Sequence, residues 1–173
     1  MLFRSLFKKF EKAGPNAQKT KAELVEKIIE ELSVHAAIEE QIFYPAIRKL
    51  VDETEETVLE SLEEHHVVKW TLSELDGMTP DEERFDAKTM VLIESVRHHV
   101  KEEEGELFPT VREALGRKEL GEIGDKMEKA KATAPRRPRP RTPDTPPGNL
   151  VTGPAAGLVD KAREAGRETL AGR

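Results

Sequence analysis

The sequence predicts an all-α protein, an up-down-up-down four-helix bundle with a truncated first helix, followed by a Pro/Arg-rich disordered tail. Apolar residues recur every three or four positions through four long segments, which is the period of an amphipathic helix. Short connections separate these segments, so successive helices are expected to be antiparallel neighbours. No stretch of any length alternates between apolar and polar residues as a β-strand does.

Capping and helix-breaking residues mark the ends of the expected helices. Thr20 and Glu23 form a capping box at the start of the second helix. Thr79 and Glu82 form another at the start of the fourth, where Pro80 occupies the first helical position. The expected helices span about residues 1–13, 20–50, 53–76 and 79–115, and a shorter helix over 118–131 either packs as an extra turn or frays.

The composition divides the chain into three regions: a bundle over 1–130, a Pro/Arg-rich linker over 131–154, and a short possible helix or disordered tail over 155–173. The density of proline in the linker excludes helix and sheet and favours an extended, polyproline-like conformation. Its four arginines allow a weak anionic partner, but the composition favours a solvated segment. The sequence does not identify a protein partner of the tail.

Composition also excludes several classes of function. A net charge of −6 gives no electrostatic reason to expect nucleic-acid binding. No segment approaches the ~18 consecutive apolar residues of a transmembrane helix, and no cleavage pattern follows the apolar, basic start, so a cytoplasmic protein is expected. The chain has no cysteine, so any metal must be held by nitrogen and oxygen ligands, which suits iron or manganese.

The most informative residues are histidines placed where a buried helix stripe requires apolar side chains. His35 and Glu39 face the expected core one turn apart, and His99 and Glu103 do the same on the fourth helix. His65 occupies an equivalent position on the third helix. An unpaired polar group buried in a bundle costs roughly 2–7 kcal/mol, so something must satisfy these side chains. A lone core histidine is usually hydrogen-bonded, and His/Glu catalysis without metal is possible, but three such helices favour a metal ion.

The doublets His65-His66 and His98-His99 each require a choice. The helical line through His98 passes a more polar face, so His99 is the better inward residue. The choice between His65 and His66 is closer, because apolar residues such as Trp70 would accompany His66, and we favour His65. Of the other glutamates near the site, Glu40, Glu102 and Glu104 are expected at the bundle edge, where one of them could swing in or support a ligand.

An internal repeat links two of these places. HAAIEEQIFYPAI at His35 and HVKEEEGELFPTV at His99 share a histidine, glutamates four and five residues later, and a proline ten residues later. Pro45 and Pro109 should each kink or end a helix beyond the site. The two copies lie 64 residues apart, which indicates duplication of a helix pair and a pseudo-twofold site.

The repeat also predicts a histidine on the first helix. The position 64 residues before His65 is Met1, and no histidine lies near it. A misplaced start codon is our preferred explanation, and loss of one ligand is the other.

These motifs are similar to those of the hemerythrin-like, or HHE cation-binding, domain family. The similarity covers about residues 1–130 and rests on HAAIEEQIFYP, on EEHH at residues 63–66, and on RHHVKEEEGELFP at residues 97–109. It implies a four-helix bundle that holds a non-haem diiron centre. Carried over by position, the implied metal ligands are His35, Glu39, His65, His99 and Glu103. The family's first-helix histidine, in an H-x-x-x-x-x-L-F pattern, has no match here and would fall immediately before Met1.

Three functions compete on this basis. The first is a binding protein whose iron site binds or senses oxygen, nitric oxide or iron itself. The second is a diiron enzyme that consumes peroxide, and the third is a degenerate, metal-free interaction module. The sequence leaves open which small molecule binds, whether one or two irons are held, and the oligomeric state.

Overall fold

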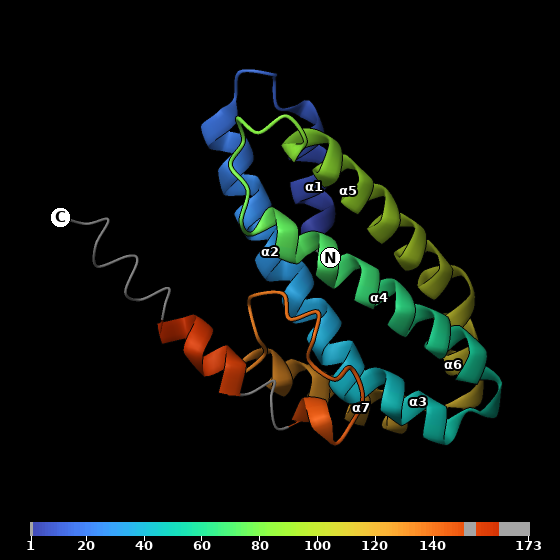
Figure 1. Ribbon diagram of the computed structural model, residues 1–173. Helices are drawn as coiled ribbons and strands as arrows, with labels where there is room; N and C mark the ends of the chain where they lie inside the picture. The colour runs from blue at the N-terminus through green and yellow to red at the C-terminus, as the bar shows by residue number, and fades with distance from the viewer. Residues whose placement is uncertain (1, 151–154, 163–173) are drawn as a thin grey trace.

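A computed structural model describes residues 2–150 and 155–162, and within these ranges all regular structure is helical. The four long helices of the bundle are α1 (Phe3–Lys12), α2 (Gln18–Ile38), α4 (Glu55–Leu75) and α5 (Phe85–Glu102). Helix α1 packs along α2, and α4 packs along α5 (Figure 1). The predicted all-α fold is therefore confirmed, with α1 much shorter than the other three bundle helices. In the described part of the chain no helix is long and apolar enough to cross a membrane.

Shorter helices close one end of the bundle. Helix α2 continues through a π-helical turn, η1 (Glu39–Phe43), into α3 (Tyr44–Leu50), and α5 continues through η3 (Glu103–Leu107) into α6 (Phe108–Ala114). A 3₁₀ turn, η2 (Asp52–Thr54), leads into α4, and α7 (Arg117–Lys131) packs against η1 and α2. Figure 1 shows α3, α6 and α7 gathered at the same end of the molecule.

The internal repeat produces the same backbone twice. The Tyr44 N–H donates to the Glu39 carbonyl and the Phe108 N–H to the Glu103 carbonyl, each five residues back, so both copies contain a π turn. The proline of each copy lies in the first turn of the next helix, where its missing N–H is tolerated. Each predicted kink is thus a π-helical turn after which the helix restarts. Such turns are frequent at functional sites.

Two apolar clusters fill the bundle, and the histidines and glutamates of interest lie between them. One cluster joins α1, α2, α4 and α5, and the other joins α3, α4, α6 and α7. On α4, Val68 belongs to the first cluster and Leu62 to the second, while the buried His65 lies between the two. The polar layer is therefore enclosed by hydrophobic packing on both sides along the bundle.

Two expected helix starts are wrong. Helix α2 begins at Gln18 with no side-chain cap, so Thr20 and Glu23 lie inside it. Helix α5 begins at Phe85, and Thr79 instead donates to the Glu82 carboxylate within a turn. The intervening residues 79–84 are polar and largely exposed, so burial anchors the helix only from Phe85 onward.

The described part of the linker also differs from its expected solvated state. Residues 132–150 fold back beside α2 and α7, as the orange segment in Figure 1 shows. Arg137 forms ion pairs with Glu26 on α2 and with Asp76, and the Asn149 amide donates to the Glu40 carbonyl at 3.0 Å. Proline-rich chain loses little further entropy when ordered, so a few buried contacts hold it against the bundle.

Part of the predicted C-terminal region is a helix. Residues 155–162 are helical, and the buried Asp160 accepts a hydrogen bond from Arg139 at 2.7 Å. The remaining positions of the 155–173 prediction lie outside the described residues.

Candidate metal centre

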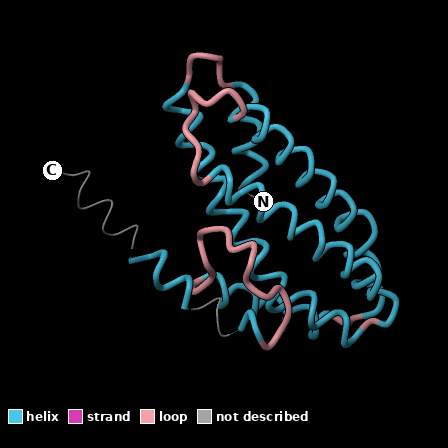
Figure 2. The backbone as a smooth tube through the Cα atoms, in the orientation of Figure 1, coloured by secondary structure: helices cyan, strands magenta, loops and turns pink. Residues whose placement is uncertain are grey.

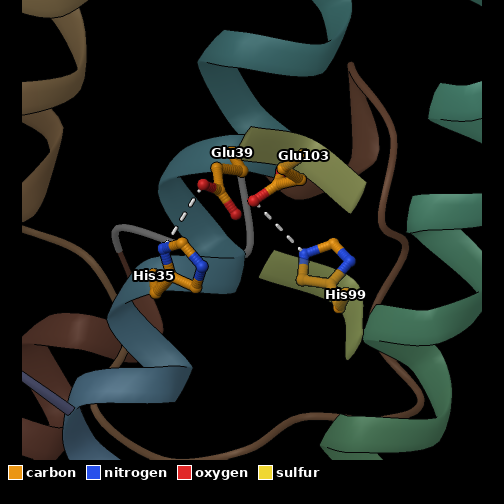
Figure 3. Close-up of side chains that lie close together, drawn as sticks. All are labelled: His35, Glu39, His99 and Glu103. Atoms are coloured by element: carbon orange, nitrogen blue, oxygen red, sulfur yellow. Dashed lines mark ion pairs between the residues drawn. The ribbon is translucent and has the colours of Figure 1, made fainter. Parts of the chain in front are cut away.

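Two His/Glu pairs from the repeat converge at the middle of the bundle (Figure 3). His35 Nδ1 lies 3.3 Å from Glu39 Oε1, and His99 Nε2 lies 3.6 Å from Glu103 Oε2. One ligand atom from each of these four residues lies within 4.8 Å of those of the other three. Helix α2 with η1 supplies the first pair, and α5 with η3 supplies the second. One cluster of possible metal ligands is therefore assembled from segments that are distant in sequence.

His65 reaches the same cluster from α4. Its Nε2 lies 3.5 Å from Glu39 Oε2 and 3.1 Å from His99 Nε2. The side chain is buried, whereas the adjacent His66 is partly exposed and accepts a hydrogen bond from the Trp70 indole. The structure thus brings all five predicted residues together and directs His65, rather than His66, inward. Their role as ligands stays a prediction.

The other doublet follows the same pattern. His99 is buried, while His98 is exposed and pairs with Glu102 on the surface at 3.2 Å. Glu64, His98 and Glu102 also form a smaller cluster of possible ligands near the surface. It has no histidine from a second helix, and two of its members already form an ordinary surface ion pair.

Helix α1 contributes an aromatic contact to the cluster. The ring centroid of Phe3 lies 5.3 Å from that of His35. No histidine precedes His35 in this sequence.

Three supporting residues were not identified from the sequence. The Tyr44 hydroxyl donates to Glu103 Oε1 at 3.0 Å. Glu64 lies 2.7 Å from His99 Nδ1; because a carboxylate only accepts, Nδ1 carries the proton and Nε2 presents its lone pair to the cluster. Lys69 contacts the cluster indirectly, through Glu40. The only sequence signals for Tyr44 and Glu64 were their positions beside a proline and a histidine of the motifs.

Glu40 does not lie at the bundle edge, where it was expected. It is buried, its Oε1 lies 3.2 Å from His65 Nδ1, and Lys69 contacts both of its oxygens at 2.8 and 3.0 Å. Glu104 does lie at the edge, where it pairs with Arg4 at 2.7 Å. Glu40 therefore supports His65 from behind, as carboxylates commonly support histidine ligands.

Burial sets the protonation of the cluster. Desolvation raises the pKa of Glu39 well above its ordinary value, and the neighbouring carboxylates Glu103 and Glu40 add to the shift. Burial also raises the pKa of Glu103. The pKa of His35 is lowered to about 3, first by burial and then by the other imidazoles, and burial lowers the pKa of His65. The imidazoles of His35 and His65 are therefore neutral, and the two close carboxylates Glu39 and Glu103 require either protons or a cation.

Unpartnered atoms show that this donor set fits a metal ion. His35 Nε2, Glu39 Oε2 and Glu103 Oε2 are buried and have no hydrogen-bond partner. Leaving such a group unsatisfied costs about 1–3 kcal/mol, and more where it is charged. Neutral imidazole nitrogens and carboxylate oxygens are the donors that iron and manganese accept, and a divalent cation also removes the repulsion between Glu39 and Glu103.

The fold and the donor set define a class of protein, the helix bundle with a buried histidine–carboxylate cation site. The chain belongs to the hemerythrin HHE cation-binding domain family, whose model matches residues 2–111.

Individual proteins are also similar to this chain. An uncharacterized hemerythrin-like protein of Schizosaccharomyces pombe is 30% identical over 135 residues, which are 78% of this chain and 66% of that protein. A DNA nickase of Nostoc is 27% identical over 105 residues, which are 61% of this chain but only 29% of that protein. A crystal structure of a hemerythrin HHE cation-binding domain-containing protein from Mycobacterium kansasii matches with a TM-score of 0.63 and 24% identity, covering 76% of this chain and 78% of that one. This last similarity concerns the fold.

Proposed function

We propose that the chain binds a pair of non-haem irons through His35, Glu39, His65, His99 and Glu103, and that it binds or senses oxygen, nitric oxide or iron. The observation that carries the proposal is the pairing of two buried carboxylates, Glu39 and Glu103, each with an unpartnered oxygen and each beside the histidine of its own repeat copy. Two carboxylates can bridge two cations, and the repeat supplies one from each half of the bundle.

The residues of the chain divide the work of holding such a pair. His35 and His99 present nitrogen donors from opposite halves, and His65 lies between them. Glu64 and Glu40 each lie against the Nδ1 atom of a histidine, which orients the ring and leaves Nε2 facing the cluster. The bound iron would supply an exchangeable coordination position for a small diatomic ligand or peroxide.

The surroundings of the site suit reversible binding. The apolar clusters on either side exclude water from the polar layer. The Tyr44 hydroxyl lies 3.4 Å from His65 Nε2 and donates to Glu103, so a phenol hydroxyl lies directly beside the cluster. Burial raises the pKa of this phenol well above its ordinary value, so the hydroxyl keeps its proton.

The test is iron content per chain after anaerobic loading with ferrous iron and removal of the excess. Two irons per chain support the proposal, one contradicts the pair, and none contradicts the metal site. His65→Ala and His99→Ala should lose iron, whereas the matched neighbours His66→Ala and His98→Ala should keep it. Loss of iron in His98→Ala alone would assign the metal to the surface cluster with Glu64 and Glu102.

A second measurement distinguishes binding from catalysis. Loaded protein is mixed with peroxide, and its consumption is compared with that by the same concentration of free iron. Consumption no faster than that by free iron agrees with a binding protein. Faster, repeated consumption would make the protein an enzyme.

A further inference from the structure

A small cavity, partly open to solvent and lined by both apolar and polar side chains, lies between the folded-back linker and the bundle. The cavity has a volume of about 40 Å³. Since one water requires roughly 10–15 Å³ by the same measure, there is room for a solute of only a few heavy atoms. The residues that matter for its chemistry are Ser33 of α2, Glu40 of η1, Lys69 of α4, and Arg137, Arg139 and Asn149 of the linker.

Unpartnered polar atoms gather at this cavity as they do at the candidate metal centre. The described residues contain six buried side-chain polar atoms without a hydrogen-bond partner. Three belong to the His/Glu cluster, and the other three are Ser33 Oγ, Arg139 Nε and Asn149 Oδ1, all on residues that line the cavity. Ser33 and Asn149 are each at least nine-tenths buried. Because native proteins leave few such groups unsatisfied, this concentration indicates a ligand.

The charges around the cavity favour an anion. Three cationic side chains line it, those of Lys69, Arg137 and Arg139, with Glu40 as the only carboxylate in the lining. Lys69 pairs with Glu40, and Arg137 pairs with Glu26 and Asp76 outside the lining, so Arg139 is the cation with a free donor. The acidic partner of Arg139, Asp160, does not line the cavity and engages Nη2 at 2.7 Å, which leaves Nε available. The cavity therefore combines positive charge, a free donor and a serine hydroxyl.

The third unpartnered atom, Asn149 Oδ1, restricts the chemical class of the ligand further. Asn149 donates its amide hydrogens to the carbonyls of Glu40 and Asp144, at 3.0 and 2.9 Å, which fixes the side chain with Oδ1 as a pure acceptor. An oxyanion without hydrogen cannot satisfy that oxygen. The ligand must carry both negative oxygens and a hydroxyl.

We propose that this cavity binds a small hydroxylated oxyanion, of which bicarbonate is the simplest that fits. Arg139 Nε and the Ser33 hydroxyl donate to its charged oxygens, and Asn149 Oδ1 accepts its hydroxyl hydrogen. The cavity takes none of its lining from the five proposed metal ligands, although Glu40 lines it and also contacts His65, and the proposed anion binding does not require iron. It is formed only when the linker lies against the bundle.

The test uses the full-length chain stripped of metal, so that an anion cannot bind at iron. Amide resonances of ¹⁵N-labelled protein are followed during titration with sodium bicarbonate at mildly alkaline pH, with chloride holding the ionic strength constant. Saturable shifts at residues around Ser33, Lys69 and Asn149 are expected. Sodium nitrate, a planar anion of the same charge and similar size but without a hydroxyl, should bind at least about tenfold more weakly.

Two variants and a matched control complete the experiment. Ser33→Ala and Arg139→Lys should each weaken bicarbonate binding by about tenfold, the second while keeping the positive charge. Ser95→Ala changes a helix serine on α5 whose hydroxyl already donates to the Val91 carbonyl, and it should leave binding unchanged. Because Ser33 Oγ is unsatisfied without ligand, Ser33→Ala should fold at least as stably as the parent.

Three results would overturn the proposal. One is the absence of saturable shifts with bicarbonate in the parent protein. Another is binding that survives unchanged in both Ser33→Ala and Arg139→Lys. The third is nitrate binding as tight as bicarbonate binding, which would remove the role of Asn149 Oδ1.

Discussion

The two halves of the repeat share one backbone and differ in what surrounds it. Each half runs from α-helix through a π turn to a helix that restarts at proline, with a histidine and a glutamate facing the cluster. The glutamate that follows the cluster residue behaves differently in each half. Glu40 is buried against His65 and Lys69, whereas Glu104 is exposed and pairs with Arg4. Local sequence therefore sets backbone geometry, and the neighbouring helix decides what an equivalent side chain does.

Aromatic residues show the same divergence. Tyr44 and Phe108 occupy equivalent repeat positions, yet only Tyr44 has a hydroxyl. This hydroxyl donates to Glu103, which belongs to the other half of the repeat. For each pair of equivalent residues, a substitution in one half of the repeat can therefore be compared with the matching substitution in the other half.

The largest effect is expected on iron affinity, at the glutamates that face the cluster in both halves of the repeat. Glu39→Gln and Glu103→Gln each remove a charged oxygen donor from the cluster, so iron affinity should fall by at least about a hundredfold in both. Iron content per chain after dialysis against a weak chelator measures this. An affinity loss confined to one variant would show that the two halves contribute unequally to the metal.

The next effect is on the free energy of unfolding, and it should differ between the two halves of the repeat. Glu40→Gln leaves Lys69 as a buried charge without its counter-ion, so the free energy of unfolding should fall by about 3 kcal/mol. Glu104→Gln breaks only an exposed ion pair and should change it by about 0.5 kcal/mol or less. Urea denaturation of metal-free protein compares the two. Equal losses would mean that Glu40 is no more structural than its surface counterpart.

A pH effect on metal affinity should arise from Glu39 and Glu103 and not from His35 or His65. The lowered pKa values of His35 and His65 keep both rings neutral near pH 6, so they do not exchange protons for metal there. The raised pKa values of Glu39 and Glu103 do require proton release on metal binding, so affinity should fall as pH falls, by up to about tenfold per pH unit for each proton released. Cobalt titrations at several pH values measure the slope. Glu103→Gln should flatten it, and a slope unchanged by that substitution would assign the protons elsewhere.

The smallest effect concerns the hydroxyl that only one half possesses. Tyr44→Phe removes the donor to Glu103 Oε1 while keeping the ring, so metal affinity should fall by about tenfold. Phe108→Leu changes the equivalent residue of the other half, which touches no cluster residue through a polar atom, and should leave affinity within about twofold. Cobalt titration at fixed pH distinguishes them. Equal losses would indicate that the aromatic packing, and not the hydroxyl, supports the site.

Much of the candidate site follows from periodicity alone. His35, Glu39, His99 and Glu103 were found because helical spacing puts them in line with buried apolar residues, and the choice of His65 over His66 agrees with the observed burial. The helix starts were less predictable. The Thr79–Glu82 pairing forms as a local interaction, but it closes a turn because residues 79–84, between Met78 and Phe85, bury no apolar side chain in the bundle.

The residues that support the cluster could not be predicted from the sequence, and the reason is physical. Glu64 and Lys69 matter because they face His99 and Glu40 on other helices, and no local pattern records which side chains meet across a bundle. The linker shows the same limit. Its proline content correctly excluded helix and strand between 132 and 147, but residues 148–150 are helical, where the prolines end. Its docking depends on pairing Arg137 with Glu26, more than a hundred residues away.

Helical class, the repeat, and the inward-facing histidines and glutamates are properties of local sequence, because hydrophobic period and proline position act within a few turns of chain. Three features exist only in the folded molecule. They are the contacts of Glu64, Lys69 and Tyr44 around the cluster, the different environments of Glu40 and Glu104, and the cavity beneath the linker. They depend on which surfaces the packed helices bring together, and burial then sets the charge and hydrogen bonding of each group.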